Sequence, residues 1–519
     1  MPGLIATPHH SASEAGAEAL AAGGTAVDAA LAAAAVLTVV YPHNCALGGD
    51  LFALLRQPGG TVHAINASGT APARTQPAGS TGRQRSLPLL GVETITVPGL
   101  VAGWGRLHEL GARLAWPDAL AAATRLAADG APVAPGLADA IGALPSLESN
   151  PALFELLAPG RTRLRAGEML VQSRLAATLE RLARGGPREF YCGEIAAELA
   201  GGLSRLGSRI SPEDLAGYAI REDPPLRAEI GACELVTCAP NSSGVLLSQA
   251  LLALAATGRR DPLGHDAGVL AAIFAAGSEQ RERMLGDPEA HPFEPDPWLG
   301  EQRIEQIARD ALALGGGSGP ALPVSSSPRP GGDTVGIVAL DSEGRAVALI
   351  QSLFHSFGAQ VLEPSTGILL HNRGAGFSLE RDHPNALGPG RRPAHTLMPV
   401  LVEREGRLLG VLGAMGGRIQ PQAHAQVLLR MIAGTSPEQA VAAPRFAVGP
   451  MELGEPPGTA RFEEDCDPAV PAALTSAGFD PVAVPVHSDY LGHVQAIWTE
   501  GEPRAGSDPR ADGSAVTVR

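Results

Sequence analysis

The chain contains no lysine, so all 39 of its lysine-or-arginine side chains are arginines. This absence excludes mechanisms that need a lysine, such as a phosphate-binding loop, a Schiff base or a serine–lysine pair. Cysteine is also scarce, because the five present are odd in number and scattered, unlike a disulfide framework or a zinc finger. The G-x-S-x-G pattern of a serine-hydrolase nucleophile elbow is missing as well.

Positive charge is in short supply overall. The formal net charge is -15, and no basic block interrupts it, so nucleic acid is not an expected partner. The N-terminus lacks the basic start and apolar stretch of a signal peptide. The most apolar run, 29–40, is too short to cross a bilayer. We therefore expect a cytoplasmic protein without a membrane partner.

Hydrophobic spacing predicts a mixture of helices and strands in a chain too long for a single small core. Two helices are expected within 11–40, and helical spacing dominates from about 100 to 310. Strands are expected at 51–56, 62–65, 93–97, 367–370, 399–403 and 408–412, with a helix over 421–433. Helical segments around strand-rich cores are typical of stacked sheets between helical layers.

The most informative junction in the chain is Asp333-Thr334. A Gly-, Ser- and Pro-rich stretch at 315–332 reads as a flexible linker, and Thr334 then opens the buried strand pattern TVGIVAL. A second apolar strand, AVALIQSL, follows the turn Asp-Ser-Glu-Gly, so the two predict a hairpin. A threonine hydroxyl is a poor nucleophile unless a base takes its proton. An α-amine on the same residue, with a pKa near 8, can act as that base once the chain is cut ahead of Thr334.

The order of several short motifs resembles the γ-glutamyltransferase family of N-terminal nucleophile hydrolases over nearly the whole chain. These motifs include GGTAVDAALAAAAVLTVV, GGD, TVPGLVAGW, SPEDLAGY, PNSSG, GGDTVGIVALDSEGRAVALIQSLFHSFG, TGILLHNR, MGGRIQPQ, AAPRF and GSDPR. The resemblance implies an α+β fold, the four-layer αββα sandwich, made as a proenzyme. It further implies a large subunit, 1–333 with a flexible linker at 315–333, and a small subunit, 334–519, which together form one body.

Four residues match the family's catalytic positions. The resemblance makes Thr334 the nucleophile, which would first attack the Asp333 carbonyl to cut the chain. It places Ser352 as a hydroxyl that hydrogen-bonds the nucleophile, although a solvent-facing strand serine is the alternative. It makes Gly416 and Gly417 the oxyanion hole, and two glycines would let backbone N–H groups approach the oxyanion without obstruction. A simple tight turn is the alternative for that pair.

The pocket departs from the glutathione-cleaving members of the family at several positions. Ser68 stands where an arginine holds the α-carboxylate, and Gly376 stands where an acidic residue pairs with the α-amine. His395-Thr396 replaces a paired serine, and Phe354 replaces an asparagine. Arg373 occupies the place of a neutral amide, where it could grip a substrate carboxylate or form a buried structural pair. We take Arg373, His395, Thr396 and Ser68 as candidate substrate-binding residues.

The sequence therefore predicts a self-processing amidohydrolase or acyltransferase that acts on γ-glutamyl or related carboxylate-bearing amides. A branch of the family that includes oxamate amidohydrolase suggests an oxamate-like or N-acyl amide substrate instead. A non-catalytic binding or scaffold protein of the same fold is the third possibility. No metal or organic cofactor is implied, and the expected partners are a small-molecule amide and the protein's own cleaved subunit, possibly as a dimer of these heterodimers.

Overall fold

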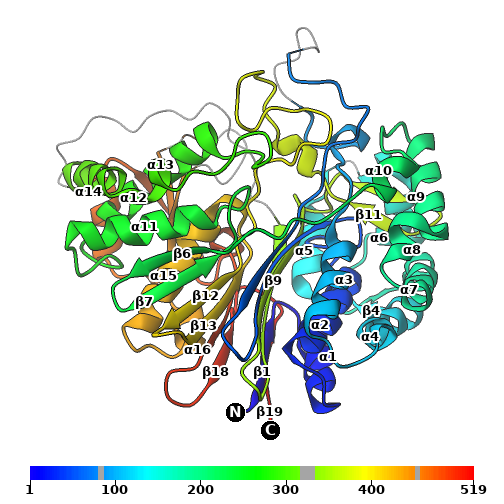
Figure 1. Ribbon diagram of the computed structural model, residues 1–519, viewed down its shortest axis with the longest axis horizontal. Helices are drawn as coiled ribbons and strands as arrows, with labels where there is room; N and C mark the ends of the chain where they lie inside the picture. The colour runs from blue at the N-terminus through cyan, green and yellow to red at the C-terminus, as the bar shows by residue number, and fades with distance from the viewer. Residues whose placement is uncertain (80–86, 146, 316–332, 450–455, 457) are drawn as a thin grey trace.

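Two antiparallel six-stranded sheets face each other, and a layer of helices covers the outer side of each (Figure 1). The computed structural model describes residues 1–79, 87–145, 147–315, 333–449, 456 and 458–519. The expected four-layer αββα sandwich is confirmed. Among the described residues, no helix combines the length and the apolar content that a membrane span requires.

The first sheet has the strand order β19-β1-β8-β9-β2-β3, and the second has the order β18-β17-β13-β12-β7-β6. The first is made of β1 (Gly3–Thr7), β2 (Asp50–Arg56), β3 (Val62–Ala67), β8 (Asp333–Leu340), β9 (Ala346–Phe354) and β19 (Ser514–Val518). The second is made of β6 (Leu226–Ile230), β7 (Cys233–Thr237), β12 (Val400–Arg404), β13 (Arg407–Ala414), β17 (Val494–Trp498) and β18 (Arg504–Ser507).

Helices α1 to α10 lie on the side of the first sheet, and helices α11 to α16 lie on the side of the second (Figure 1). The first group is α1 (His10–Ala21), α2 (Ala26–Val40), α3 (Leu100–Gly111), α4 (Trp116–Asp129), α5 (Pro135–Ala143), α6 (Pro151–Leu157), α7 (Ser173–Gly185), α8 (Arg188–Cys192), α9 (Glu194–Arg205) and α10 (Pro212–Ala216). The second is α11 (Gly244–Thr257), α12 (Ala267–Met284), α13 (Asp296–Leu299), α14 (Glu301–Gly315), α15 (Gln420–Ile432) and α16 (Pro437–Ala442), with α17 (Ala469–Ser476) packed against α12.

Smaller sheets complete the fold. They pair β4 (Ala131–Pro132) with β5 (Met169–Leu170), β10 (Val361–Glu363) with β11 (Ile368–Leu370), and β14 (Phe446–Val448), β15 (Thr459–Glu463) and β16 (Asp480–Val484) with one another.

The alanine-rich composition of helix α2 explains why it can be buried between other layers. Thr25 caps its N-terminus in a capping box with Asp28, and every residue of the helix is buried. Because eight of its side chains are small alanines or a threonine, the helix packs closely between α1, α4 and the strands β8 and β9. Alanine also has the highest helix propensity, so a fully buried helix forms without bulky side chains.

Among the apolar clusters of the described residues, three lie between the layers of the sandwich. One apolar cluster fills the space between the first sheet and its helices, and a second does so for the other sheet. A thinner third cluster joins the sheets to each other through residues such as Phe52, Val338, Ile350 and Val411. Along β8, Val338 belongs to the inter-sheet cluster, so Thr334 and Gly336 face the second sheet too, because strand residues two apart share a face.

Segments on both sides of the Asp333–Thr334 bond contribute strands to both sheets. In the first sheet, β1 lies between β8 and β19, and in the second, β7 lies beside β12. The segments before and after that bond therefore form one interleaved body.

Most of the expected elements are present, including both helices within 11–40 and the hairpin after Thr334. The expected strand at 93–97 is wrong, because Val92–Thr94 forms a 3₁₀ turn. The carbonyl of Thr96 accepts a hydrogen bond from the His371 ring, which takes it out of any strand ladder. The predicted linker at 315–332 lies almost entirely outside the described residues.

Candidate active site

The hairpin of β8 and β9 brings Thr334 directly opposite Ser352. Its turn is closed by Asp341, whose carboxylate accepts hydrogen bonds from the backbone N–H groups of Glu343 and Arg345. Gly344 has a φ of 86°, which glycine adopts at little cost. The turn therefore fixes the register of the two strands, and with it the pairing of the two hydroxyls at the far end.

A short chain of hydrogen bonds joins the two hydroxyls to the peptide bond before Thr334. The Thr334 Oγ1 donates to Ser352 Oγ over 3.0 Å, and Ser352 Oγ donates to the carbonyl oxygen of Asp333 over 2.7 Å. Ser352 Oγ also accepts from the backbone N–H of Phe354 over 2.8 Å. The single proton of Ser352 is thus directed at the carbonyl that Thr334 would attack, and Thr334 itself is fully buried.

The strand pairing is irregular at this point. Asp333 pairs with Phe354 whereas Thr334 pairs with Ser352, so one extra residue is accommodated in β9. Phe354 has a φ of 82°, a left-handed conformation that costs a bulky side chain about 1–3 kcal/mol. Bulges and strained residues of this kind concentrate at functional sites, where they turn backbone groups toward the chemistry.

Gly416 and Gly417 form the turn between β13 and α15. Their φ values are 139° and 53°, so both occupy backbone regions that favour glycine. The backbone groups of Met415 and His493 hydrogen-bond each other in both directions, which holds the turn from the β17 side. The turn also leads into the N-terminus of α15, where the helix dipole favours a negative charge.

Two glycines bring this turn close to Thr334. A Cβ placed on Gly336 would lie 2.5 Å from the carbonyl carbon of Gly413 and 2.7 Å from the nitrogen of Ala414. The backbones of β8 and β13 are therefore in direct contact two residues after Thr334 and three residues before Gly416. The predicted nucleophile and the predicted oxyanion turn lie at the same end of the two sheets.

Arg373 is fully buried, in the turn after β11, and its guanidinium lies 3.8 Å from the centroid of the Phe354 ring. Its Nε is 3.8 Å from a carboxylate oxygen of Asp50, which is an ion pair but too long for a hydrogen bond. Among the described residues, none of its three guanidinium nitrogens has a hydrogen-bond partner. Burial lowers the pKa of Arg373 to about 9, so the side chain remains cationic at neutral pH.

His395 is also fully buried, but both of its ring nitrogens have protein partners. Nε2 lies 3.0 Å from Asp50 Oδ2, and Nδ1 accepts from the backbone N–H of Leu397 over 3.3 Å. The proton therefore belongs on Nε2, where it is donated to Asp50. Burial and the charge of Arg373 lower the pKa of His395 to about 3, so the ring is neutral.

Asp50 and His371 also lie in the candidate site, and sequence reasoning missed them. Asp50 pairs with Ser352 across β2 and β9, so Thr334, Ser352 and Asp50 form one row on three neighbouring strands. His371 Nδ1 lies 3.2 Å from the same Asp50 oxygen. One signal was available: each is a polar residue at the end of a strongly apolar strand pattern, DLFALLR and TGILLH.

The remaining predicted substrate-binding residues differ in how free their hydroxyls are. Ser68 Oγ donates to Asn66 Oδ1 over 2.7 Å and accepts from Asn241 Nδ2 over 3.2 Å, so it is engaged within the protein. Thr396 Oγ1 is buried without a hydrogen-bond partner in the part of the chain that the structure describes. The binding roles of Ser68, Thr396, His395 and Arg373 stay predictions.

Asp333 carries an unusual carboxyl group beside the bond that the chain is predicted to cut. Burial, reinforced by the charge of Asp489, raises the pKa of Asp333 to about 7 from its ordinary value of 3.8. A side-chain hydrogen bond from Ser356 and the nearby His493 act in the opposite direction. This carboxyl is therefore partly protonated at neutral pH.

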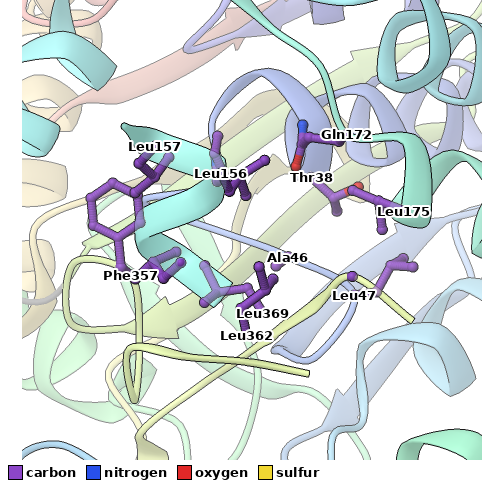
Figure 2. Close-up of a pocket in the computed structure, with 13 residues that line it drawn as sticks. Thr38, Ala46, Leu47, Leu156, Leu157, Gln172, Leu175, Phe357, Leu362 and Leu369 are labelled. Atoms are coloured by element: carbon purple, nitrogen blue, oxygen red, sulfur yellow. The ribbon is translucent and has the colours of Figure 1, made fainter. Parts of the chain in front are cut away.

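Two cavities lie along β11 and the turn that follows it. Figure 2 shows a small apolar one, lined mainly by leucines with Phe357, and its volume of about 10 Å³ holds at most a single water. A larger cavity of about 320 Å³ lies beside the turn that carries Arg373, with Gly374, Phe377 and Thr96 in its lining. Thr96 Oγ1 hydrogen-bonds the His371 ring, so this cavity is one side chain away from the Asp50 contacts.

Comparison with known proteins matches the chain from end to end. The family described as gamma-glutamyltranspeptidase matches residues 12–518. The chain is 34% identical to the oxamate amidohydrolase proenzyme of Klebsiella pneumoniae, over 99% of this chain and 98% of that protein. It is 32% identical to the glutathione hydrolase-like YwrD proenzyme of Bacillus subtilis, with the same coverage.

The fold of the chain is also similar to that of solved structures. A cephalosporin acylase from Bacillus halodurans superposes with a TM-score of 0.86 at 28% identity, covering 99% of this chain and 95% of that one.

Proposed function

Because the chain belongs to the gamma-glutamyltranspeptidase family of amide-cleaving enzymes, we propose that it matures and acts through the hydroxyl of Thr334. The observation that supports this most strongly is the hydrogen-bond chain from Thr334 Oγ1 through Ser352 Oγ to the Asp333 carbonyl. It connects a nucleophile, a proton carrier and an electrophile in the uncut chain.

The contacts of Ser352 describe how the cut would proceed. As Thr334 Oγ1 bonds to the Asp333 carbonyl carbon, its proton passes to Ser352, and the Ser352 proton passes to the carbonyl oxygen. The tetrahedral intermediate then returns that proton to the Thr334 nitrogen, and the C–N bond breaks to leave an ester. Breakage of the C–N bond frees the α-amine of Thr334, and water then hydrolyses the ester, which frees the Thr334 hydroxyl and leaves Asp333 with a carboxylate.

The mature site would then use the same residue twice. The Thr334 amine takes the hydroxyl proton while Oγ1 attacks the carbonyl of a small amide substrate. The N–H groups of the Gly416–Gly417 turn would stabilise the oxyanion, and the loss of one such donor typically costs about 3 kcal/mol. The leaving amine departs with a proton, and water or another amine releases the acyl group.

Two substrate classes remain in competition. Hydrolysis of γ-glutamyl compounds such as glutathione agrees with the name of the Bacillus subtilis relative. Hydrolysis of oxamate or a similar carboxylate-bearing amide agrees with the name of the Klebsiella pneumoniae relative and with the unpaired guanidinium of Arg373. The second class is favoured, because Gly376 supplies no carboxylate for an α-amine.

A denaturing gel of the wild-type protein and of Thr334→Ala tests the proposal. A cut before Thr334 divides the 519-residue, 53.0-kDa chain into fragments of about 34 and 19 kDa. The shorter fragment should begin Thr-Val-Gly-Ile on N-terminal sequencing. Thr334→Ala should stay at full length and hydrolyse no amide. An active but uncut wild-type protein, or an active Thr334→Ala variant, would refute the assignment, and an uncut inactive wild type would favour the scaffold alternative.

A further inference from the structure

A buried cluster of four ionisable side chains, Asp50, His371, Arg373 and His395, lies beside the predicted nucleophile. We call it the Asp50 cluster. Its relative exposures range from 0% to 1%, so solvent does not compensate any charge within it. Asp50 lies in the same cross-strand row as Ser352 and Thr334, and such neighbours point to the same face of the sheet.

Both carboxylate oxygens of Asp50 are already occupied. Oδ1 accepts from the backbone N–H of Gly69 over 2.8 Å, and Oδ2 faces the rings of His395 and His371 at 3.0 and 3.2 Å. Although burial acts to raise it, these two histidines hold the pKa of Asp50 well below its ordinary range. Asp50 is therefore a fixed anion whose two oxygens both already have contacts within the protein.

Arg373, unlike Asp50, is held in place by its neighbours while its guanidinium nitrogens lack hydrogen-bond partners among the described residues. The Phe354 ring supports one face of the guanidinium, and Asp50 attracts it from the Nε edge without forming a hydrogen bond. Within the described residues, Asp50 is the only carboxylate at ion-pair distance from it. A buried cation with unsatisfied donors costs several kcal/mol, and a planar two-oxygen anion is the partner that its geometry suits.

We propose that Asp50 is a positioning residue, which holds Arg373 by its Nε edge so that both Nη groups receive a carboxylate on the acyl part of the substrate. This inference rests on the proposed function. Since both oxygens of Asp50 already have contacts within the protein and position 376 is a glycine, neither position offers a substrate ammonium an unengaged carboxylate. The substrate class is the monoamides of short dicarboxylic acids that carry no α-amine.

Matched amides that differ by one charge test this assignment. Succinamate, succinamide and asparagine share a four-carbon acyl chain, and glutaramate, glutaramide and glutamine share a five-carbon chain. For the cleaved wild-type enzyme we expect kcat/KM on the better monoamide to exceed that on its neutral diamide by about 100-fold. It should exceed that on the ammonium-bearing counterpart by about 10-fold or more.

Variants locate the origin of that preference. Arg373→Met should reduce the monoamide-to-diamide ratio toward one. Asp50→Asn should reduce it about 10-fold, mainly through a higher KM for the monoamide, while the diamide changes less. Arg404→Met, which removes an arginine paired with Glu500 at the surface, is the matched control and should keep the wild-type ratio.

Several outcomes separate this inference from the proposed function. Equal losses on monoamide and diamide in Arg373→Met, an unchanged ratio in Asp50→Asn, or a preference for glutamine over glutaramate would each overturn it. In all three cases Thr334-dependent hydrolysis would still support the proposed function. If Asp50→Asn yields no cleaved protein, His371→Gln should lower the ratio about threefold, and an unchanged ratio there would overturn the inference.

Discussion

At the scale of single residues, Ser352 is the side chain whose hydrogen bonds bear most directly on the proposed cleavage. Its hydroxyl accepts from Thr334 and from Phe354, and its only proton is donated to the Asp333 carbonyl. Removing that hydroxyl would leave the Thr334 proton without a route to the carbonyl oxygen. In the uncut chain Ser352 is therefore hydrogen-bonded to both Thr334 and the Asp333 carbonyl, rather than merely packed against Thr334.

We predict that Ser352→Ala slows self-cleavage by about 100-fold, the usual effect of losing a positioned proton carrier. Ser352→Thr keeps a hydroxyl at the same atom and should cleave at a rate within about 10-fold of wild type. A time course of fragment formation on denaturing gels measures both. Cleavage of Ser352→Ala at the wild-type rate would contradict the proton route.

The carboxyl of Asp333 gives a second prediction at this scale. Its pKa is about 7 in the fold but near 3.8 when unfolded, so the folded chain holds a proton that the unfolded chain has released. Folding stability must then fall as pH rises from about 4 to about 7. In the uncut Thr334→Ala background, Asp333→Asn should remove this loss, because an amide does not titrate.

Thermal unfolding between pH 4 and pH 8 measures the effect. The Tm advantage of Asp333→Asn should grow across that range to about 2 °C or more. A Tm difference that is constant with pH would show that Asp333 is ionised throughout.

At the scale of secondary-structure elements, the contact between β8 and β13 places the candidate site. Gly336 and Gly413 let the two backbones touch, so the end of β13 and its glycine turn approach Thr334. A methyl group at position 336 would meet the backbone of Gly413 and Ala414, which no side-chain rotation can relieve. The same substitution at Gly142, in helix α5, meets no atom within 4 Å.

Gly336→Ala should therefore destabilise the fold by about 1–3 kcal/mol and slow self-cleavage, because the sheets must move apart. Gly142→Ala is the control and should stabilise the fold by up to about 1 kcal/mol, since alanine replaces glycine inside a helix. Denaturant unfolding measures both free energies. Equal effects in the two variants would mean that the inter-sheet contact at Gly336 is not tight.

Sequence reasoning predicted these elements unevenly, and the reasons are physical. The hairpin of β8 and β9 was predictable because a polar turn separates two apolar strands. Strands β1 and β19 were not predicted, because each pairs with a segment hundreds of residues away and carries little local signal. The segment at 93–97 has strand-like residues, but its Thr96 carbonyl is taken by His371.

The residues of the candidate site were also predicted unevenly from the sequence. Thr334, Ser352 and the glycine turn could be placed from short motifs. The polar Asp50 ahead of an apolar strand was a local signal, but its place beside Ser352 required the register of three strands. The Nε2 atom of His395 is engaged by Asp50, which lies 345 residues away in sequence, whereas Nδ1 accepts from the backbone of Leu397, only two residues further along the chain. Long-range contacts of this kind decide which polar residues are free to bind a substrate, and no local pattern records them.

At the scale of the whole molecule, the two halves of the chain cannot be separated without breaking both sheets. Strands β1, β2 and β3 lie in one sheet with β8 and β9, and β6 and β7 lie in the other with β12 and β13. The apolar clusters between the layers also draw residues from both sides of the bond before Thr334.

The cleaved protein should therefore elute from a gel-filtration column as one species that contains both fragments. Its Tm should lie within about 5 °C of the uncut Thr334→Ala variant, because the cut removes no strand pairing. Urea well above the unfolding midpoint is needed to separate the fragments. Separate elution without denaturant would contradict the interleaved arrangement.

The pairing of β1 with β19 also makes a circular permutation of the chain possible. Gly3 lies opposite Val518, so a linker of about two to five residues could join the present ends as a hairpin. A circularly permuted gene could then start at Thr334 and stop at Asp333. Removal of the initiator methionine would expose the Thr334 amine directly, so such an enzyme should be active from a single intact polypeptide, with maturation bypassed.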